Sequence, residues 1–179
     1  MSVFTNPAVR SADQAKAYTS AIIDLLGRRD PMNVLAATPA ELERALDRLS
    51  HAQITQPEAS GKWSIRHVLQ HLADSELVWG WRLRLVLAQD RPQLTGYDQD
   101  LWADRLGYSA VEAEDAVQDF TVLRNANLRL LGRMQAADLD RVGVHVERGE
   151  ESVRHMIRLY AGHDLMHLQQ IERIRKAVS

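Results

Sequence analysis

The most constraining feature of the chain is the amphipathic segment from Val153 to Lys176, which carries two histidines four residues apart. At about 100° per residue, His163 falls at the edge of the apolar face centred on Tyr160, and His167 falls near its middle. The other members of this face are Val153, Met156, Ile157, Ile171 and Ile174. The pattern predicts a long helix whose histidines point into the core.

A buried imidazole needs a partner for each ring nitrogen. A metal ion would use two histidines together, whereas buried carbonyls or tyrosine hydroxyls would pair with each one separately. Because His-x3-His spacing is common on helices by chance, the spacing alone leaves both interpretations open.

Composition indicates a soluble globular protein with one domain, residues 1–179. Hydrophobic residues make up 45% of the 179 residues and charged residues 26%, and the formal net charge is −2. The basic residues are mostly arginines spread along the helices, so we expect neither nucleic acid nor an anionic membrane as a partner.

The chain has no cysteine, which excludes disulfides, thiolate metal ligands and a cysteine nucleophile. Any thiol chemistry would therefore use a thiol that a ligand brings. Neither a signal-peptide pattern nor a run of 18 apolar residues is present, so the expected location is the cytoplasm.

Helix-capping and periodicity signals predict an all-α protein. Asp30-Pro31 is expected to break the chain, and Thr38-Pro39-Ala40-Glu41 is expected to open a short helix as a capping box. The alternating segment Val142–Val146 is too isolated to predict a sheet. The expected helices span about residues 7–28, 38–49, 64–89, 99–106, 109–134 and 153–176. We predict a four-helix bundle with a long connection between its second and third helices.

The predicted helix from Ser64 carries a second group of polar residues. His71 borders its apolar face, while His67 and Asp74 point toward solvent. His71 is therefore the best candidate to converge with the two histidines of the last helix. Glu76 lies near the centre of the apolar face, where a carboxylate needs either an arginine from a neighbouring helix or a functional partner.

Three neutral imidazoles without a thiolate suit zinc, nickel, iron, manganese or another divalent ion. Three protein ligands leave a position open for water or substrate, which is typical of catalytic sites. An ion held in this way lowers the pKa of a coordinated water or thiol.

Trp63-Ser64 followed by His71-Leu-Ala-Asp-Ser75 resembles the W-S-x6-H-L-x-D-S signature of the DinB/YfiT-like superfamily of metal-dependent four-helix-bundle enzymes. Two further stretches resemble motifs of the same superfamily. A second stretch resembles the R…P…P-Y-D-x-x-x-W-A motif of the YfiT branch, with Arg82, Pro92, Gly96-Tyr97-Asp98 and Trp102-Ala103. The last helix is similar to the pattern Y-x-x-H-x-x-x-H-L-x-x-I, with Tyr160, His163, His167, Leu168 and Ile171.

The resemblance implies a divalent metal, often nickel or zinc, held by His71, His163 and His167. It also implies frequent homodimers and either S-transfer from low-molecular-weight thiols, thiol-dependent isomerisation or hydrolysis. The chain departs from the branch at Gly96, often a proline, and at Glu76 and Met166, where relatives carry histidines. These departures leave the substrate open.

The resulting hypothesis is a metalloenzyme whose tri-histidine ion activates water or a small thiol cosubstrate. Glu76 and Asp164 are the candidates for orienting an imidazole or transferring a proton, and Tyr97, Asp98 and Trp102 for lining the entrance. A non-catalytic metal-binding stress-response protein and a metal-free bundle with hydrogen-bonded histidines are the alternatives.

Overall fold

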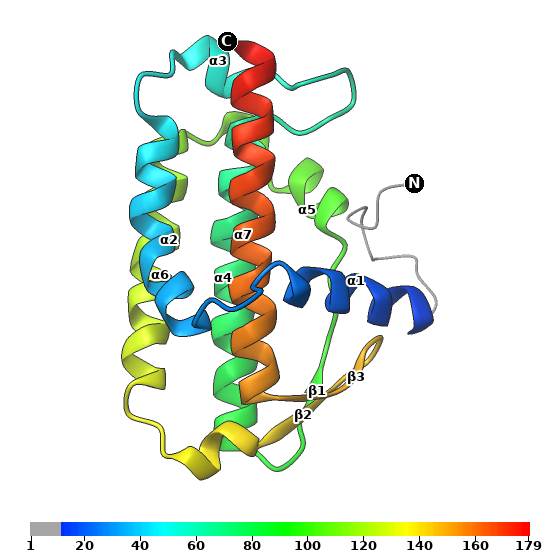
Figure 1. Ribbon diagram of the computed structural model, residues 1–179. Helices are drawn as coiled ribbons and strands as arrows, with labels where there is room; N and C mark the ends of the chain where they lie inside the picture. Colours follow the sequence, from blue (N-terminus) through cyan, green and yellow to red (C-terminus); the bar gives the residue numbers. More distant parts are fainter. Residues whose placement is uncertain (1–11) are drawn as a thin grey trace.

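The computed structural model describes residues 12–179 and confirms the predicted four-helix bundle (Figure 1). Its four helices are α2 (Pro31–Leu46), α4 (Ile65–Ala88), α6 (Ala113–Leu131) and α7 (Val153–Val178). The long connection between the second and third bundle helices, α4 and α6, contains the short α5 (Gln99–Arg105) and a 3₁₀ turn, η1 (Tyr108–Ala110). None of the helices within residues 12–179 is long and apolar enough to span a lipid bilayer.

The first helix lies outside the bundle. Figure 1 shows α1 (Ala12–Asp24) crossing the middle of α7 instead of running alongside it. Of the helix expected over residues 7–28, residues 7–11 lie outside the described part of the chain. Gly162 of α7 permits the close approach, because a Cβ there would lie 2.2 Å from the carbonyl oxygen of Ile22 in α1.

The predicted break at Asp30-Pro31 is confirmed as the boundary between α1 and α2, but the predicted helix start at Thr38 is wrong. Helix α2 begins at Pro31, where Asp30 is the N-cap and its side chain accepts a hydrogen bond from the Asn33 amide. Proline suits the first helical position because its missing N–H would have no helical partner there. Pro39 therefore lies inside the helix.

The prediction that Val142–Val146 would not join a sheet is also wrong. Strand β2 (Val142–His145) pairs antiparallel with β3 (Gly149–Ser152) and parallel with β1 (Gln93–Leu94) from the long connection. Gly149 turns the hairpin with a φ of 83°, a conformation that glycine adopts without strain. Strand β1 is only two residues long, which is why no periodicity revealed it.

Other boundaries shift by a few residues. Helix α6 begins at Ala113 with Glu112 as N-cap, because Ser109 of the expected capping box lies in the 3₁₀ turn. Two further short elements, α3 (His51–Thr55) and the 3₁₀ turn η2 (Ala136–Asp140), lie in the connections around the bundle.

The bundle interior contains two apolar clusters with polar residues between them along each helix. The first cluster includes Leu42, Leu72, Phe120 and Ile171, and the second includes Leu35, Trp79, Leu131 and Ala161. The buried polar residues that fall between these clusters are Thr38, Ser75, Glu76, Arg124, Asn127, Asp164 and His167. We call these seven residues, together with His71 and His163, the polar layer.

Candidate metal centre

The three predicted histidines converge in the polar layer. The Nε2 atom of His163 lies 3.3 Å from Nε2 of His71 and 3.1 Å from Nε2 of His167. His163 and His167 share a face because they are one turn apart on α7, and the packing of α4 against α7 brings in His71. His71 and His167 are buried, and His163 is partly exposed.

The spacing fits a divalent ion. Metal–nitrogen bonds of about 2.0–2.1 Å in tetrahedral geometry separate two ligand nitrogens by roughly 3.3 Å, close to the two observed separations. A single N–H on His163 could satisfy only one of its two neighbours, whereas a cation uses all three lone pairs together. The donor set therefore fits a borderline divalent metal.

The Nδ1 atoms, which face away from the other histidines, differ in how firmly hydrogen bonds hold their rings in place. Nδ1 of His167 lies 2.8 Å from the amide oxygen of Gln170 and donates to it, which leaves the lone pair of Nε2 facing the other histidines. Nδ1 of His71 is buried with no hydrogen-bond partner in the described chain, and its ring packs against that of Trp63.

Burial keeps the three imidazoles neutral, as metal ligands must be. Desolvation lowers the pKa of His71 and His163 well below the ordinary value, and neighbouring imidazoles add to the shift. The pKa of His167 falls to about 4, mainly through burial, with partial opposition from Gln170 and the charge of Asp164.

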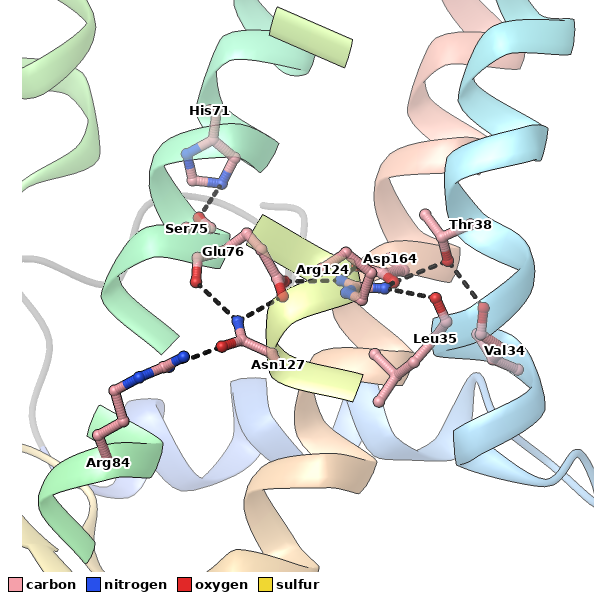
Figure 2. Close-up of polar contacts among 10 residues, drawn as sticks. All are labelled: Val34, Leu35, Thr38, His71, Ser75, Glu76, Arg84, Arg124, Asn127 and Asp164. Atoms are coloured by element: carbon pink, nitrogen blue, oxygen red, sulfur yellow. Dashed lines mark hydrogen bonds and ion pairs between the residues drawn. The ribbon is translucent and has the colours of Figure 1, made fainter. Parts of the chain in front are cut away.

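Glu76 and Asp164 are held by Arg124 of α6, as Figure 2 shows. Nη2 of Arg124 donates to Oε2 of Glu76 at 2.8 Å, and Nη1 donates to Oδ2 of Asp164 at 2.6 Å. All three side chains are fully buried. Burial raises the pKa of the Glu76 carboxyl, while the positive charge of Arg124 opposes this increase. The arginine partner expected as one alternative for Glu76 is therefore present.

The remaining bonds of this network connect all four bundle helices. Asn127 of α6 donates to Oε1 of Glu76 at 2.8 Å, and the hydroxyl of Thr38 in α2 donates to Oδ2 of Asp164 at 2.7 Å. The described hydrogen bonds of the two carboxylates go to Arg124, Asn127 and Thr38, and none goes to an imidazole. We call these five side chains the Arg124 network.

Pro39 gives Arg124 a further acceptor. Proline has no N–H, so the carbonyl of Leu35, four residues earlier, loses its helical donor. Nη1 of Arg124 donates to that carbonyl at 2.9 Å instead (Figure 2). Sequence reasoning missed Arg124, although a signal existed: Arg124 and Asn127 interrupt the stripe formed by the apolar residues Ala113, Ala116, Val117, Phe120 and Leu131.

A cavity of about 90 Å³ opens beside the histidines and is lined by His71 and His163. Its other walls come from α1, the long connection after β1, and the hairpin. Of the residues expected at an entrance, Tyr97 lines the cavity and bonds the Ser75 hydroxyl at 2.7 Å. Trp102 packs on the ring of Tyr97, while the Asp98 carboxylate caps α5.

The family model of the DinB superfamily matches residues 35–171, which is more than half of the chain. The chain belongs to the DinB superfamily. The matched region contains the three histidines and the Arg124 network, and it excludes α1.

Similar curated proteins carry provisional names as metal-dependent hydrolases. One from Bacillus mycoides is 29% identical over 141 residues, covering 79% of this chain and 81% of its own length. One from Oceanobacillus iheyensis is 29% identical over 145 residues, covering 81% of this chain and 84% of its own length.

A solved structure supports the fold. YfiT from Bacillus subtilis, described as a probable metal-dependent hydrolase with an unusual four-helix bundle topology, superposes with a TM-score of 0.77. The two chains are 23% identical, and the match covers 82% of this chain and 84% of YfiT.

Proposed function

We propose that this DinB-superfamily protein is a metal-dependent enzyme that activates water or the sulfur of a small thiol at His71, His163 and His167. The observation that carries the proposal is the convergence of three neutral imidazole nitrogens, with His71 and His163 in the wall of a cavity. The names of the curated relatives support a metal-dependent reaction.

A divalent ion at these histidines, zinc or nickel by preference, would act as a Lewis acid that lowers the pKa of the nucleophile. The chain supplies the surroundings of the reaction. The hydrogen-bonded pair Ser75 and Tyr97 stands beside His71, with the Ser75 hydroxyl 3.4 Å from Nε2, so it is placed to orient the reacting group.

We assign Glu76 and Asp164 a positioning role. Both carboxylates are bound to Arg124, and each lies next in sequence to a residue of the site, Ser75 or His163. The Arg124 network thereby fixes α4 against α7, which carry the three candidate ligands. Proton transfer by Glu76 or Asp164 has no support in their hydrogen bonds.

Two reaction types fit the site, and one screen distinguishes them. Protein reconstituted with zinc or nickel is assayed with simple esters and amides, and separately with small thiols and an electrophile. Turnover of the esters or amides indicates hydrolysis, whereas turnover of the thiols with the electrophile indicates S-transfer. His71→Ala removes a candidate ligand, whereas His51→Ala changes an exposed histidine at the start of α3 and serves as the control.

We expect turnover in the wild type and in His51→Ala, and background rates in His71→Ala. A metal-loaded protein that turns over neither set would favour the non-catalytic metal-binding alternative. We also propose that the protein is located in the cytoplasm. We further propose that it forms a homodimer, which light scattering would measure.

A further inference from the structure

Arg82 is a buried cation that has no carboxylate partner among residues 12–179. Its side chain on α4 is 5% exposed, and its guanidinium bonds only neutral groups. Nη2 donates to the carbonyl oxygen of Thr95, and Nη1 lies 3.4 Å from the Tyr160 hydroxyl. None of the ion pairs among the described residues includes Arg82. A buried charge without a counter-ion is costly, so this position calls for an anion.

The other charged residues of the cavity do not supply that anion. Arg148 is paired in two bonds with Glu151, at 2.5 and 3.0 Å. Glu147 is the one acidic residue in the described cavity lining, and its carboxylate packs against Gly96 without forming an ion pair with Arg82. Nearby His145 is buried, and desolvation together with the charges of Arg148 and Arg82 keeps it neutral.

The cavity connects Arg82 with the metal centre, because Arg82, His71 and His163 all line it. Its volume of about 90 Å³ is several times the roughly 10–15 Å³ that a single water molecule needs. A small polar group fits this space, and the planar fork of a guanidinium matches a carboxylate in size and geometry.

We infer that Arg82 binds a carboxylate of the molecule whose reacting atom lies at His71, His163 and His167. This inference rests on the proposed function and narrows it to acidic small molecules. A substrate carboxylate would take the place of a neutral hydrogen-bond acceptor and serve as the counter-ion of Arg82. The reacting end of the same molecule would lie at the histidines.

The test uses cobalt-substituted full-length protein and two matched probes, 3-mercaptopropionate and 3-mercaptopropionamide. Both carry the same thiol, and the thiolate-to-cobalt absorption band reports the binding of each. A hydrogen bond to a charged group contributes about 1.5–3 kcal/mol, so we expect the acid to bind about 10- to 100-fold more tightly than the amide.

Arg82→Met is expected to abolish this preference, and Arg82→Lys to retain part of it. Arg129→Met, which changes an exposed arginine of α6, is expected to leave the preference unchanged. Equal binding of acid and amide by the wild type would overturn the inference. This comparison needs no variant, so it holds whether or not Arg82→Met folds. A preference that persists in folded Arg82→Met would also overturn the inference.

Failure of the proposed function would look different. In that case the wild type would take up no cobalt, or neither thiol would produce the absorption band, whatever its charge.

Discussion

Arg124 is a charged residue at a position that the pattern of α6 reserves for an apolar side chain. It is fully buried, bound to two carboxylates and a carbonyl, and stacked over Phe120 with its guanidinium carbon 4.5 Å from the ring centre. Buried ion groups of this kind contribute little net stability compared with apolar packing, but removing one member leaves uncompensated charge. The structure therefore predicts a sharp cost for losing Arg124 alone.

Arg124→Met is expected to lower the free energy of unfolding by about 3–5 kcal/mol, because Glu76 and Asp164 would remain buried without their cation. Urea unfolding followed by circular dichroism measures the change. Arg129→Met, on the exposed side of the same helix, should stay within about 0.5 kcal/mol of the wild type. Similar small effects for the two variants would contradict this account of the Arg124 network.

His145 gives a second prediction at the residue level, for stability against pH. Burial, with the charges of Arg148 and Arg82, lowers the pKa of His145 to about 3. In the unfolded chain His145 binds a proton near pH 6.5, whereas in the folded protein it stays neutral until the pH is much lower. The contribution of His145 to the free energy of unfolding is therefore fully present above pH 6.5 and is lost as the pH falls toward 3. The slope for one such histidine is at most about 1.4 kcal/mol per pH unit.

In metal-free protein, His145→Asn should reduce the slope of unfolding free energy between pH 6.5 and 4. Asparagine keeps an acceptor for the Glu147 amide, which bonds Nδ1 of His145 at 3.2 Å. His51→Asn should leave the slope of the wild type. An identical slope in wild type and His145→Asn would show that His145 is not held neutral.

At the scale of elements, the contact between α1 and α7 depends on Gly162. Gly162→Ala would place a Cβ 2.2 Å from the Ile22 carbonyl oxygen, and backbone cannot move aside cheaply. We expect a loss of about 1–3 kcal/mol and faster amide hydrogen exchange in α1. Because alanine is intrinsically better than glycine in a helix by about 1 kcal/mol, any net loss reflects the clash.

Gly132→Ala is the matched control for that variant. A Cβ there meets Leu128 O at an ordinary 3.4 Å, and the backbone is already helical, so a gain of up to about 1 kcal/mol is expected. Equal effects of the two substitutions would contradict the close packing of α1 on α7.

The elements also show where sequence reasoning succeeds. Periodicity over many residues located α4, α6 and α7, and it placed His71, His163 and His167 at or near buried faces. It misplaced the start of α2, because Thr38-Pro39-Ala40-Glu41 matches a capping box with proline at the first helical position. The distant Arg124, which supplies the Leu35 carbonyl with a donor inside the longer helix, leaves no periodic signal. It missed the sheet, because β1 is too short to carry a pattern.

The cavity could not be predicted for a related reason. Two of its walls come from the connection after β1 and the hairpin, whose side chains follow no helical period, and a third comes from α1, which lies outside the bundle. Arg82 was recognised only as part of a family motif, since its missing counter-ion is a property of the folded environment. The candidate ligands were thus visible in the sequence, while the groups that select a substrate were not.

At the scale of the whole molecule, the bundle holds three neutral imidazoles together in a polar layer between two apolar clusters. At a metal centre a divalent ion, and not hydrogen bonding alone, holds the three imidazoles together. Elemental analysis of protein purified without added metal or chelator tests this claim directly, in the wild type, His167→Ala and His51→Ala.

We predict about one zinc or nickel ion per chain in the wild type and in His51→Ala, and a large loss of that metal in His167→Ala. Metal far below one equivalent in the wild type, or unchanged content in His167→Ala, would contradict the central claim.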